Sequence, residues 1–164
     1  MTPDAVVVTL TWQEVVQAST VGLRRRIASM QQSFGERNGV ARKGAAERWY
    51  YNIVGACGEL AVAKAVNAYW PSAINQAKDE ADVGHDIQVR CLAEPHYDLI
   101  VRKDDPDYFR YVLCVGEPPT LTLVGWVWGF EAKRPEWLYD RGERNEECYW
   151  VPQAALSQMW RLKP

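Results

Sequence analysis

The stretch ADVGHDIQVR, residues 81 to 90, decides how the rest of the sequence is interpreted. Successive side chains of a strand point to opposite faces. Here one face is apolar, with Ile87 and Val89, and the other is polar, with Asp86, Gln88 and Arg90. A further acid, Asp82, lies upstream, in a bend that Gly84 indicates. The pattern predicts a strand whose polar face is either a solvated sheet edge or a site for a cation and a phosphate.

Helical spacing precedes this strand, and strand-like alternation follows it. Thr11 and Glu14 form a capping-box pattern, which predicts a helix from about residue 11 to about residue 33. A second helix is expected from Ala45 to Tyr69, because Pro71 follows. Strands are expected at 86–91, 97–102, 110–115 and 120–130, with a short one near 148–152, and the segment 133–147 is expected to be a loop. These elements predict an α/β (α+β layered) fold, in which helices cover a mixed sheet of about four to five strands.

The composition is that of an ordinary globular protein. The 164 residues are 48% apolar and 24% charged, which allows a core without disulfides. We expect a single domain over residues 1–164, with an N-terminal helix within 1–40 and the core within 45–155. No apolar run approaches the roughly 18 residues of a membrane helix, and no signal-peptide pattern opens the chain. Four cysteines without a CxxC pair, with two histidines, argue against structural zinc and indicate a reducing, cytoplasmic setting.

The overall charge gives no argument for nucleic-acid binding. The 19 basic and 21 acidic residues leave a formal net charge of −2, so affinity for DNA must come from local patches. The candidate patches are Arg24–Arg26 with Arg42 and Lys43, Arg102–Lys103, and Lys133–Arg134. Runs this short are usually solvated faces, and we interpret them in that way.

The second predicted helix carries an acid on an otherwise apolar face. In GACGELAVAKAV, residues 55–66, the neighbours of Glu59 at three and four positions are Gly55, Ala56, Val62 and Ala63. An ionised carboxylate in such a stripe needs a cation or strong hydrogen-bond donors. Either Glu59 lies at the edge of the stripe and pairs with Lys64 or solvent, or it belongs to a site.

Five motifs follow one another along the chain: GACGELAVAK, DVGHDIQVR, LIVR, YVLCVG and GWVWGFEAK. Over residues 45–155 the sequence resembles the PD-(D/E)XK nuclease superfamily, in particular compact members common in bacteriophage genomes. The resemblance implies a restriction-endonuclease-like fold, Mg²⁺ or Mn²⁺ as the cofactor, DNA as the partner, and a phage origin.

The resemblance also assigns four site residues. Glu59 matches the acid of the helix, Asp82 matches the aspartate that enters the hairpin, and Gln88 and Arg90 match the (D/E)xK pair. It thus implies that Glu59, Asp82 and Gln88 hold the metal and that Arg90 binds phosphate. Asp86 is a rival for the aspartate role, and we prefer Asp82 because the gap before Gln88 leaves room for a turn.

Two of these positions depart from the usual motif. Gln88 offers a neutral carbonyl oxygen in place of a carboxylate, and Arg90 stays protonated, so that it can clamp phosphate but cannot act as a base. Lys103, just past the next strand, is a candidate for the displaced ammonium. A literal search also matches Pro106–Asp107 with Glu131–Lys133, and we favour the first set because this second match lies in a turn and at a strand end.

We expect metal-assisted hydrolysis of DNA phosphodiester bonds by a phage-encoded protein in the host cytoplasm, without a membrane partner. The alternative is a catalytically inactive nuclease fold that binds DNA, or a phage or host protein, as an assembly module. Glutamine and arginine in the motif favour this alternative. A third is a structural or host-takeover phage protein of another fold, which a helix at residues 86–91 would indicate.

Overall fold

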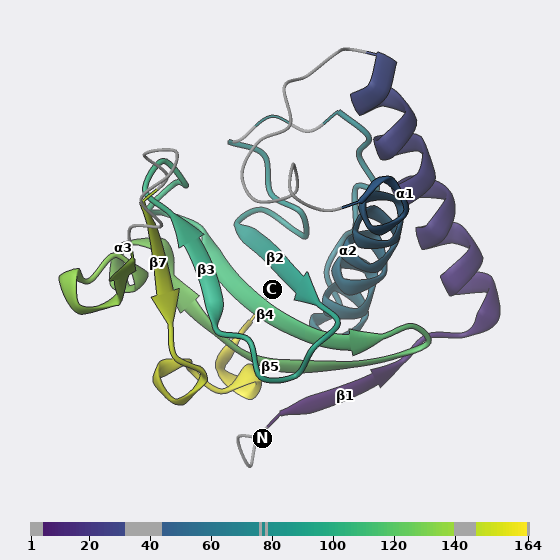
Figure 1. Ribbon diagram of the computed structural model, residues 1–164. Helices are drawn as coiled ribbons and strands as arrows, with labels where there is room; N and C mark the ends of the chain where they lie inside the picture. Colours follow the sequence, from purple (N-terminus) through teal and green to yellow (C-terminus); the bar gives the residue numbers. More distant parts are fainter. Residues whose placement is uncertain (1–4, 32–43, 76, 78, 140–146, 164) are drawn as a thin grey trace.

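The computed structural model describes residues 5–31, 44–75, 77, 79–139 and 147–163. The helices and strands among them, in chain order, are β1 (Val6–Thr9), α1 (Trp12–Gln31), α2 (Ala45–Val66), β2 (Ile87–Leu92), β3 (Leu99–Arg102), β4 (Arg110–Glu117), β5 (Thr120–Trp128), α3 (Gly129–Ala132), β6 (Leu138–Tyr139) and β7 (Cys148–Val151). Short 3-10 turns lie at Pro135–Trp137, Gln153–Ala155 and Met159–Arg161. Helices thus combine with two sheets, and the predicted α/β class is confirmed (Figure 1).

The two long helices begin and end close to where the sequence predicts. The capping box of α1 is formed, because the Thr11 backbone N–H donates to Glu14 Oε2 at 2.6 Å and the Glu14 N–H donates to Thr11 Oγ1 at 3.2 Å. The helix α2 ends earlier than predicted, since Asn67 adopts the left-handed conformation with φ 53°. Residues 32 and 33 of the first predicted helix lie outside the described residues.

The helix α2 packs against one face of the larger sheet, and α1 packs against α2 on its outer side (Figure 1). Gly22 permits their close approach, because a Cβ atom at this position would lie 2.5 Å from the Asn52 carbonyl oxygen. The contact brings the second half of α1 next to the middle of α2.

The larger sheet has four strands in the order β1-β5-β4-β2, so that β2 lies at an edge. β2 runs parallel to β4, with Gln88 opposite Tyr111, and the other pairings are antiparallel. The strand predicted at residues 86–91 is therefore present as β2, and the helix that would have indicated a different fold is not.

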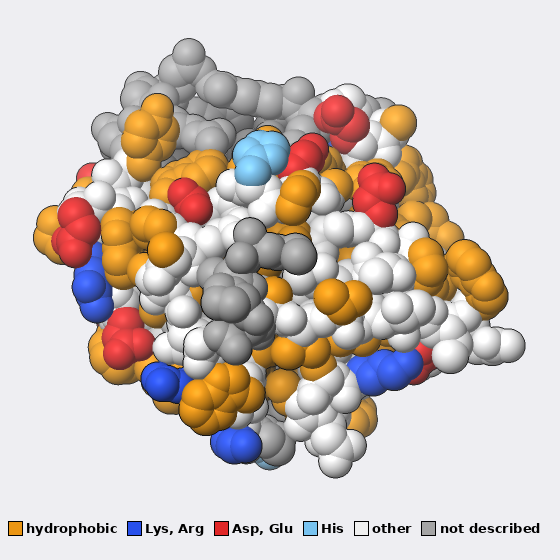
Figure 2. Space-filling model, turned by 90° about the horizontal axis from the view of Figure 1, so that it is seen from below, with side chains coloured by type: hydrophobic (Ala, Val, Ile, Leu, Met, Phe, Trp, Pro, Cys, Tyr) orange, Lys and Arg blue, Asp and Glu red, His pale blue; other side chains and the backbone are white. Residues whose placement is uncertain are grey.

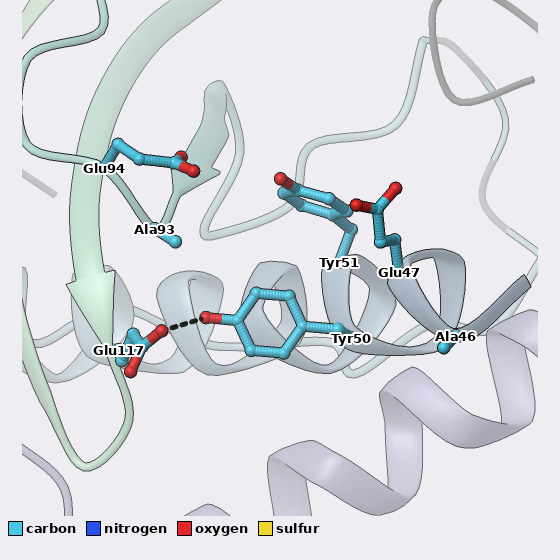
Figure 3. A pocket seen from close by; sticks show the side chains of 7 residues that line it. All are labelled: Ala46, Glu47, Tyr50, Tyr51, Ala93, Glu94 and Glu117. Carbon is cyan, nitrogen blue, oxygen red and sulfur yellow. Dashed lines mark hydrogen bonds between the residues drawn. The ribbon is translucent and has the colours of Figure 1, made fainter. Parts of the chain in front are cut away.

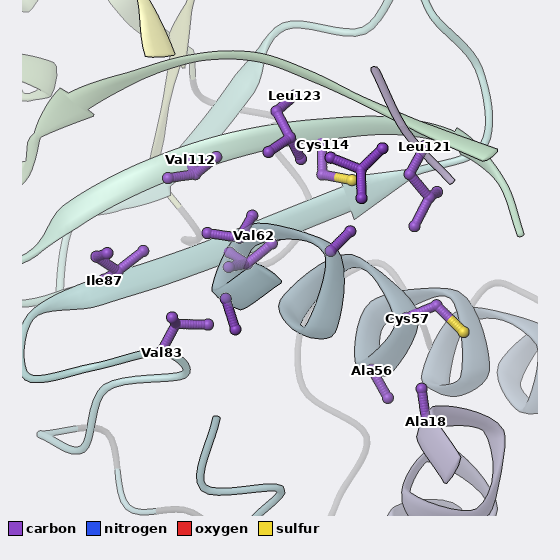
Figure 4. Packing of buried hydrophobic residues seen from close by; sticks show 14 of the residues in the cluster. Ala18, Ala56, Cys57, Val62, Val83, Ile87, Val112, Cys114, Leu121 and Leu123 are labelled. Carbon is purple, nitrogen blue, oxygen red and sulfur yellow. The ribbon is translucent and has the colours of Figure 1, made fainter. Parts of the chain in front are cut away.

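Two apolar clusters cover the two faces of this sheet. On the helix side, Val62 of α2 lies between this helix and the strands that carry Ile87, Val112 and Cys114, whereas Ala56 lies next to Ala18 of α1 (Figure 4). On the other side, Leu99, Val101 and Val151 of the second sheet, ordered β3-β7-β6, pack against Tyr111, Leu113 and Val115. Ile87 and Val89 thus face the helices, and Gln88 and Arg90 face the second sheet.

Several elements were not predicted. The strand β1 precedes the first predicted helix, and the segment 133–147, expected to be a loop, contains a 3-10 turn and β6, although residues 140–146 lie outside the described part. The strand predicted at 120–130 ends at Trp128, where α3 begins.

Candidate functional site

Glu59 is buried and is held by an arginine of the other long helix. Its side chain accepts hydrogen bonds from Arg25, from Nη1 to Oε1 at 2.5 Å and from Nη2 to Oε2 at 2.9 Å. Trp70 Nε1 also donates to Oε2, at 3.0 Å. Lys64, considered from the sequence as its partner, pairs instead with Glu14. The Glu59 carboxylate is therefore paired inside the protein, and only 6% of the residue is exposed.

Asp82 lies just outside the free edge of β2. Its Oδ2 accepts a hydrogen bond from the Val89 backbone N–H at 2.8 Å. Burial and then the negative charge of Glu59 raise the pKa of Asp82 to about 7, although this hydrogen bond and the charges of Arg90 and Arg25 act in the opposite direction. Asp82 thus lies within electrostatic reach of Glu59 on the helix side and of Arg90 on the other side.

A polar cavity of about 180 Å³ opens between β2 and the loop 103–107. Its lining includes Asp82, Gln88, Arg90, Arg102, Asp105 and Tyr111. Three of the four predicted site residues therefore meet at one cavity. Glu59 lies on the helix side of the sheet and is not part of the cavity lining. Its negative charge nevertheless raises the pKa of Asp82, which does line the cavity.

Arg90 is held by Asp105, an acid outside the predicted site. Its Nη2 donates to Asp105 Oδ2 at 2.8 Å, and its guanidinium carbon lies 5.3 Å from the centre of the Tyr111 ring. Asp105 is only 7% exposed. Asp105 belongs to the segment KDDPD, residues 103–107, whose sequence is typical of a turn. A turn sequence does not indicate that an acid within it is buried.

Asp86 does not share the cavity, contrary to the face expected from alternation. It precedes the first residue of β2, and its carboxylate accepts a hydrogen bond from Arg110 Nε at 2.7 Å. Arg110 in turn lies over the Trp128 ring at 5.6 Å. This ion pair holds the Asp86 side chain, and of the two aspartates Asp82 lines the cavity.

The second literal match lies against the cavity wall. Lys133 Nζ is 2.5 Å from Asp107 Oδ1 and donates to the Asp105 carbonyl oxygen at 2.6 Å. The hydrogen bond from Lys133 to this carbonyl oxygen braces the loop that carries Asp105. Lys103, considered for a displaced ammonium, is 67% exposed and pairs with Glu147.

A divalent cation, which the resemblance implies, fits part of the predicted ligand set. Asp82 is a carboxylate whose negative charge is poorly compensated, and Gln88 donates through its amide nitrogen to the Glu80 carbonyl oxygen at 2.7 Å, which leaves the amide oxygen as a hard ligand. Both Glu59 oxygens already accept hydrogen bonds. In the part of the chain that the structure describes, no three His, Cys, Asp or Glu side chains form a metal-binding group. Of the three predicted ligands, Asp82 and Gln88 thus keep an oxygen available for a cation at the cavity.

Several described members of the basic runs are ion-paired. Arg25, Lys103 and Lys133 are each paired with an acid, and Arg42 and Lys43 lie outside the described residues. On the face shown in Figure 2, the described Lys and Arg side chains are separated by acidic and apolar ones.

A second hollow, of about 370 Å³, lies between the start of α2 and the ends of β2 and β4. Tyr50 donates to Glu117 at 2.7 Å across it, and Glu47, Tyr51 and Glu94 complete its acidic and aromatic wall (Figure 3). None of the predicted site residues belongs to this wall, and its charge is unsuited to a nucleic-acid backbone.

Comparison with known proteins finds no matching family model, no matching curated protein and no matching solved structure. Among the described helices, none has the length and apolar composition that a membrane crossing requires.

Proposed function

We propose that this chain is a nuclease-like domain that hydrolyses DNA phosphodiester bonds with Mg²⁺ or Mn²⁺, and that a phage encodes it for action in the host cytoplasm. The observation that supports the proposal most is the meeting of Asp82, Gln88 and Arg90 at one polar cavity. The charge of Glu59 acts on the same aspartate from the helix side.

The roles follow from the chemistry of each side chain. Asp82 and Gln88 offer oxygen ligands, and Arg90 keeps N–H donors besides the one bound to Asp105, which can bind a phosphate oxygen. The negative charge of Glu59 disfavours the ionisation of Asp82, so a cation bound in the cavity would offset the repulsion between the two carboxylates. When bound, a divalent cation would supply an activated water and offset the charge that develops on the phosphate.

The burial of these groups argues for a function rather than for stability. Glu59, Gln88 and Asp105 are each at most 9% exposed. Buried ion pairs rarely stabilise a fold more than apolar residues of similar size would. Asp82 lines the same cavity, and burial raises its pKa; an acid with a raised pKa at a cavity is typical of functional sites.

The test is incubation of the purified protein with plasmid and with single-stranded DNA, with and without Mg²⁺ or Mn²⁺. We expect metal-dependent cleavage that Asp82→Asn and Arg90→Ala abolish and Glu59→Gln reduces. Asp107→Asn is the matched control, because the Asp107 side chain is 63% exposed and pairs with Lys133. Cleavage that survives Asp82→Asn would contradict the proposed site.

A second candidate function is a catalytically inactive nuclease fold that binds DNA or a protein partner. The bidentate hold of Arg25 on Glu59 favours it, because this pairing neutralises one of the expected metal ligands. Wild-type protein that neither cleaves DNA nor is stabilised by Mn²⁺ would support this second candidate.

A further inference from the structure

We propose that Asp105 is a positioning residue that holds the Arg90 guanidinium in its phosphate-binding orientation in the cavity. What Arg90 binds rests on the proposed function. That Asp105 fixes Arg90 rests on the contacts alone.

The first of these contacts joins a buried carboxylate to a partly buried guanidinium. Asp105 Oδ2 accepts from Arg90 Nη2 at 2.8 Å, and the Asp105 side chain is 8% exposed. A charge-assisted hydrogen bond is stronger away from water, so this carboxylate restricts the Arg90 side chain more than an exposed partner would.

Asp105 is itself fixed by the loop around it. The same Oδ2 accepts from the Arg102 backbone N–H at 2.9 Å, and the Asp105 N–H donates back to the Arg102 carbonyl oxygen at 3.1 Å. Lys133 Nζ donates to the Asp105 carbonyl oxygen. These contacts fix the position of the Asp105 carboxylate, and the carboxylate in turn fixes the position of the Arg90 guanidinium.

Tyr111 fixes the remaining freedom of the guanidinium. Its fully buried ring lies against Arg90, and its hydroxyl donates to the Pro106 carbonyl oxygen at 2.9 Å, which ties the ring to the same loop. Because the edge of the guanidinium is held by Asp105 and its face by Tyr111, the remaining N–H donors keep a constant direction. Such preorganisation lowers the entropic cost of binding a phosphate.

The decisive variant is Asp105→Asn. Asparagine keeps an oxygen for the Arg102 N–H, so the loop turn is retained, but it loses the charge that attracts Arg90. Asp107→Asn is the matched control, because it removes a carboxylate of the same loop that does not touch Arg90.

The first readout is the Arg90 Nε–Hε signal in a nitrogen-15 NMR spectrum recorded without DNA, assigned by its absence in Arg90→Lys. We expect a distinct signal in the wild type and in Asp107→Asn. In Asp105→Asn its exchange with water should be about tenfold faster or more, because the guanidinium is released. A signal that exchanges in Asp105→Asn as it does in the wild type overturns the inference, provided that the amide spectrum shows an intact fold.

The second readout is steady-state cleavage of a DNA oligonucleotide. We expect Asp105→Asn to raise KM about tenfold and to change kcat by less than about threefold, and we expect Asp105→Asn to cause no further loss when it is added to Arg90→Lys. Equal effects of Asp105→Asn and Asp107→Asn on KM would overturn the inference. If the wild type neither cleaves nor binds DNA, the proposed function fails, and the Arg90 signal alone decides whether Asp105 positions Arg90.

Discussion

Arg25 of α1 and Glu59 of α2 are joined by two hydrogen bonds, one to each carboxylate oxygen. The side chains are 17% and 7% exposed, so water screens the pair little. The pair links the two long helices and places a negative and a positive charge where both act on Asp82.

Arg25→Ala should destabilise the fold by about 3 kcal/mol, because it leaves the Glu59 carboxylate buried without its cation. Urea denaturation measures the loss, and replacing both residues, as in Arg25→Met with Glu59→Leu, should recover most of it. Arg24→Ala is the control, since Arg24 is exposed on the same helix and should change stability by less than about 0.5 kcal/mol. Equal losses for the two arginines would contradict the pairing.

Asp82→Asn should change how stability depends on pH. In the wild type the pKa of Asp82 rises from 3.8 to about 7 on folding, so folding favours the protonated acid. The stability that this provides is complete below about pH 4 and is lost as the pH rises through about 7, at up to about 1.4 kcal/mol per pH unit. Asparagine stays neutral and can still accept from the Val89 N–H. Urea denaturation across this window should therefore show Asp82→Asn gaining on the wild type as the pH rises, and parallel curves would refute the shift.

Mn²⁺ should stabilise the wild type and Asp86→Asn but not Asp82→Asn. A cation at about ten times its Kd adds about 1.4 kcal/mol, which corresponds to a rise in Tm of about 3 to 5 °C. Asp86→Asn will start from a lower Tm, because it breaks the pair with Arg110, so the comparison is between the shifts. A shift lost in Asp86→Asn and kept in Asp82→Asn would reverse our choice of aspartate.

Two glycines of α2 near Glu59 should respond oppositely to alanine. A Cβ atom at Gly58 would lie 2.7 Å from both Cβ and Sγ of Cys91, whereas nothing lies within 4 Å of one at Gly55. We expect Gly58→Ala to cost about 1 to 2 kcal/mol and Gly55→Ala to stabilise by up to about 1 kcal/mol. Urea midpoints of the two variants test this, and a stabilising Gly58→Ala would mean that β2 lies farther from α2.

The sequence predicts most of the local structure and part of the site. The capping box at Thr11, the helix carrying Glu59 and the strand carrying Gln88 and Arg90 follow from spacing alone. The position of β2 at the sheet edge, parallel to β4, does not follow from spacing. Alternation shows which residues of a strand share a face, but it does not show which element packs against that face. For this reason the sequence could not reveal that Glu59 and Gln88 approach Asp82 from opposite sides of the sheet.

Arg25 and Asp105 were missed for different reasons. Arg25 belongs to the basic run Arg24–Arg26, which we interpret as a solvated face. Its helical spacing from the buried residues Ala18, Val21 and Gly22 nevertheless indicates that it lies on the buried stripe of α1. Asp105 has no such signal in the sequence, since it is held by Arg90 and Lys133, which lie 15 and 28 residues away along the chain.

The hydrogen bond between Asp82 and the Val89 N–H has a consequence beyond the cavity. β2 is a terminal strand, and the outward-facing amide of an edge strand is a place where another chain could add by β-pairing. The carboxylate occupies this donor and sets an acid beside it. We expect Asp82→Ala to expose this donor and to make the protein more prone to aggregation, so a single side chain would serve both solubility and the proposed chemistry.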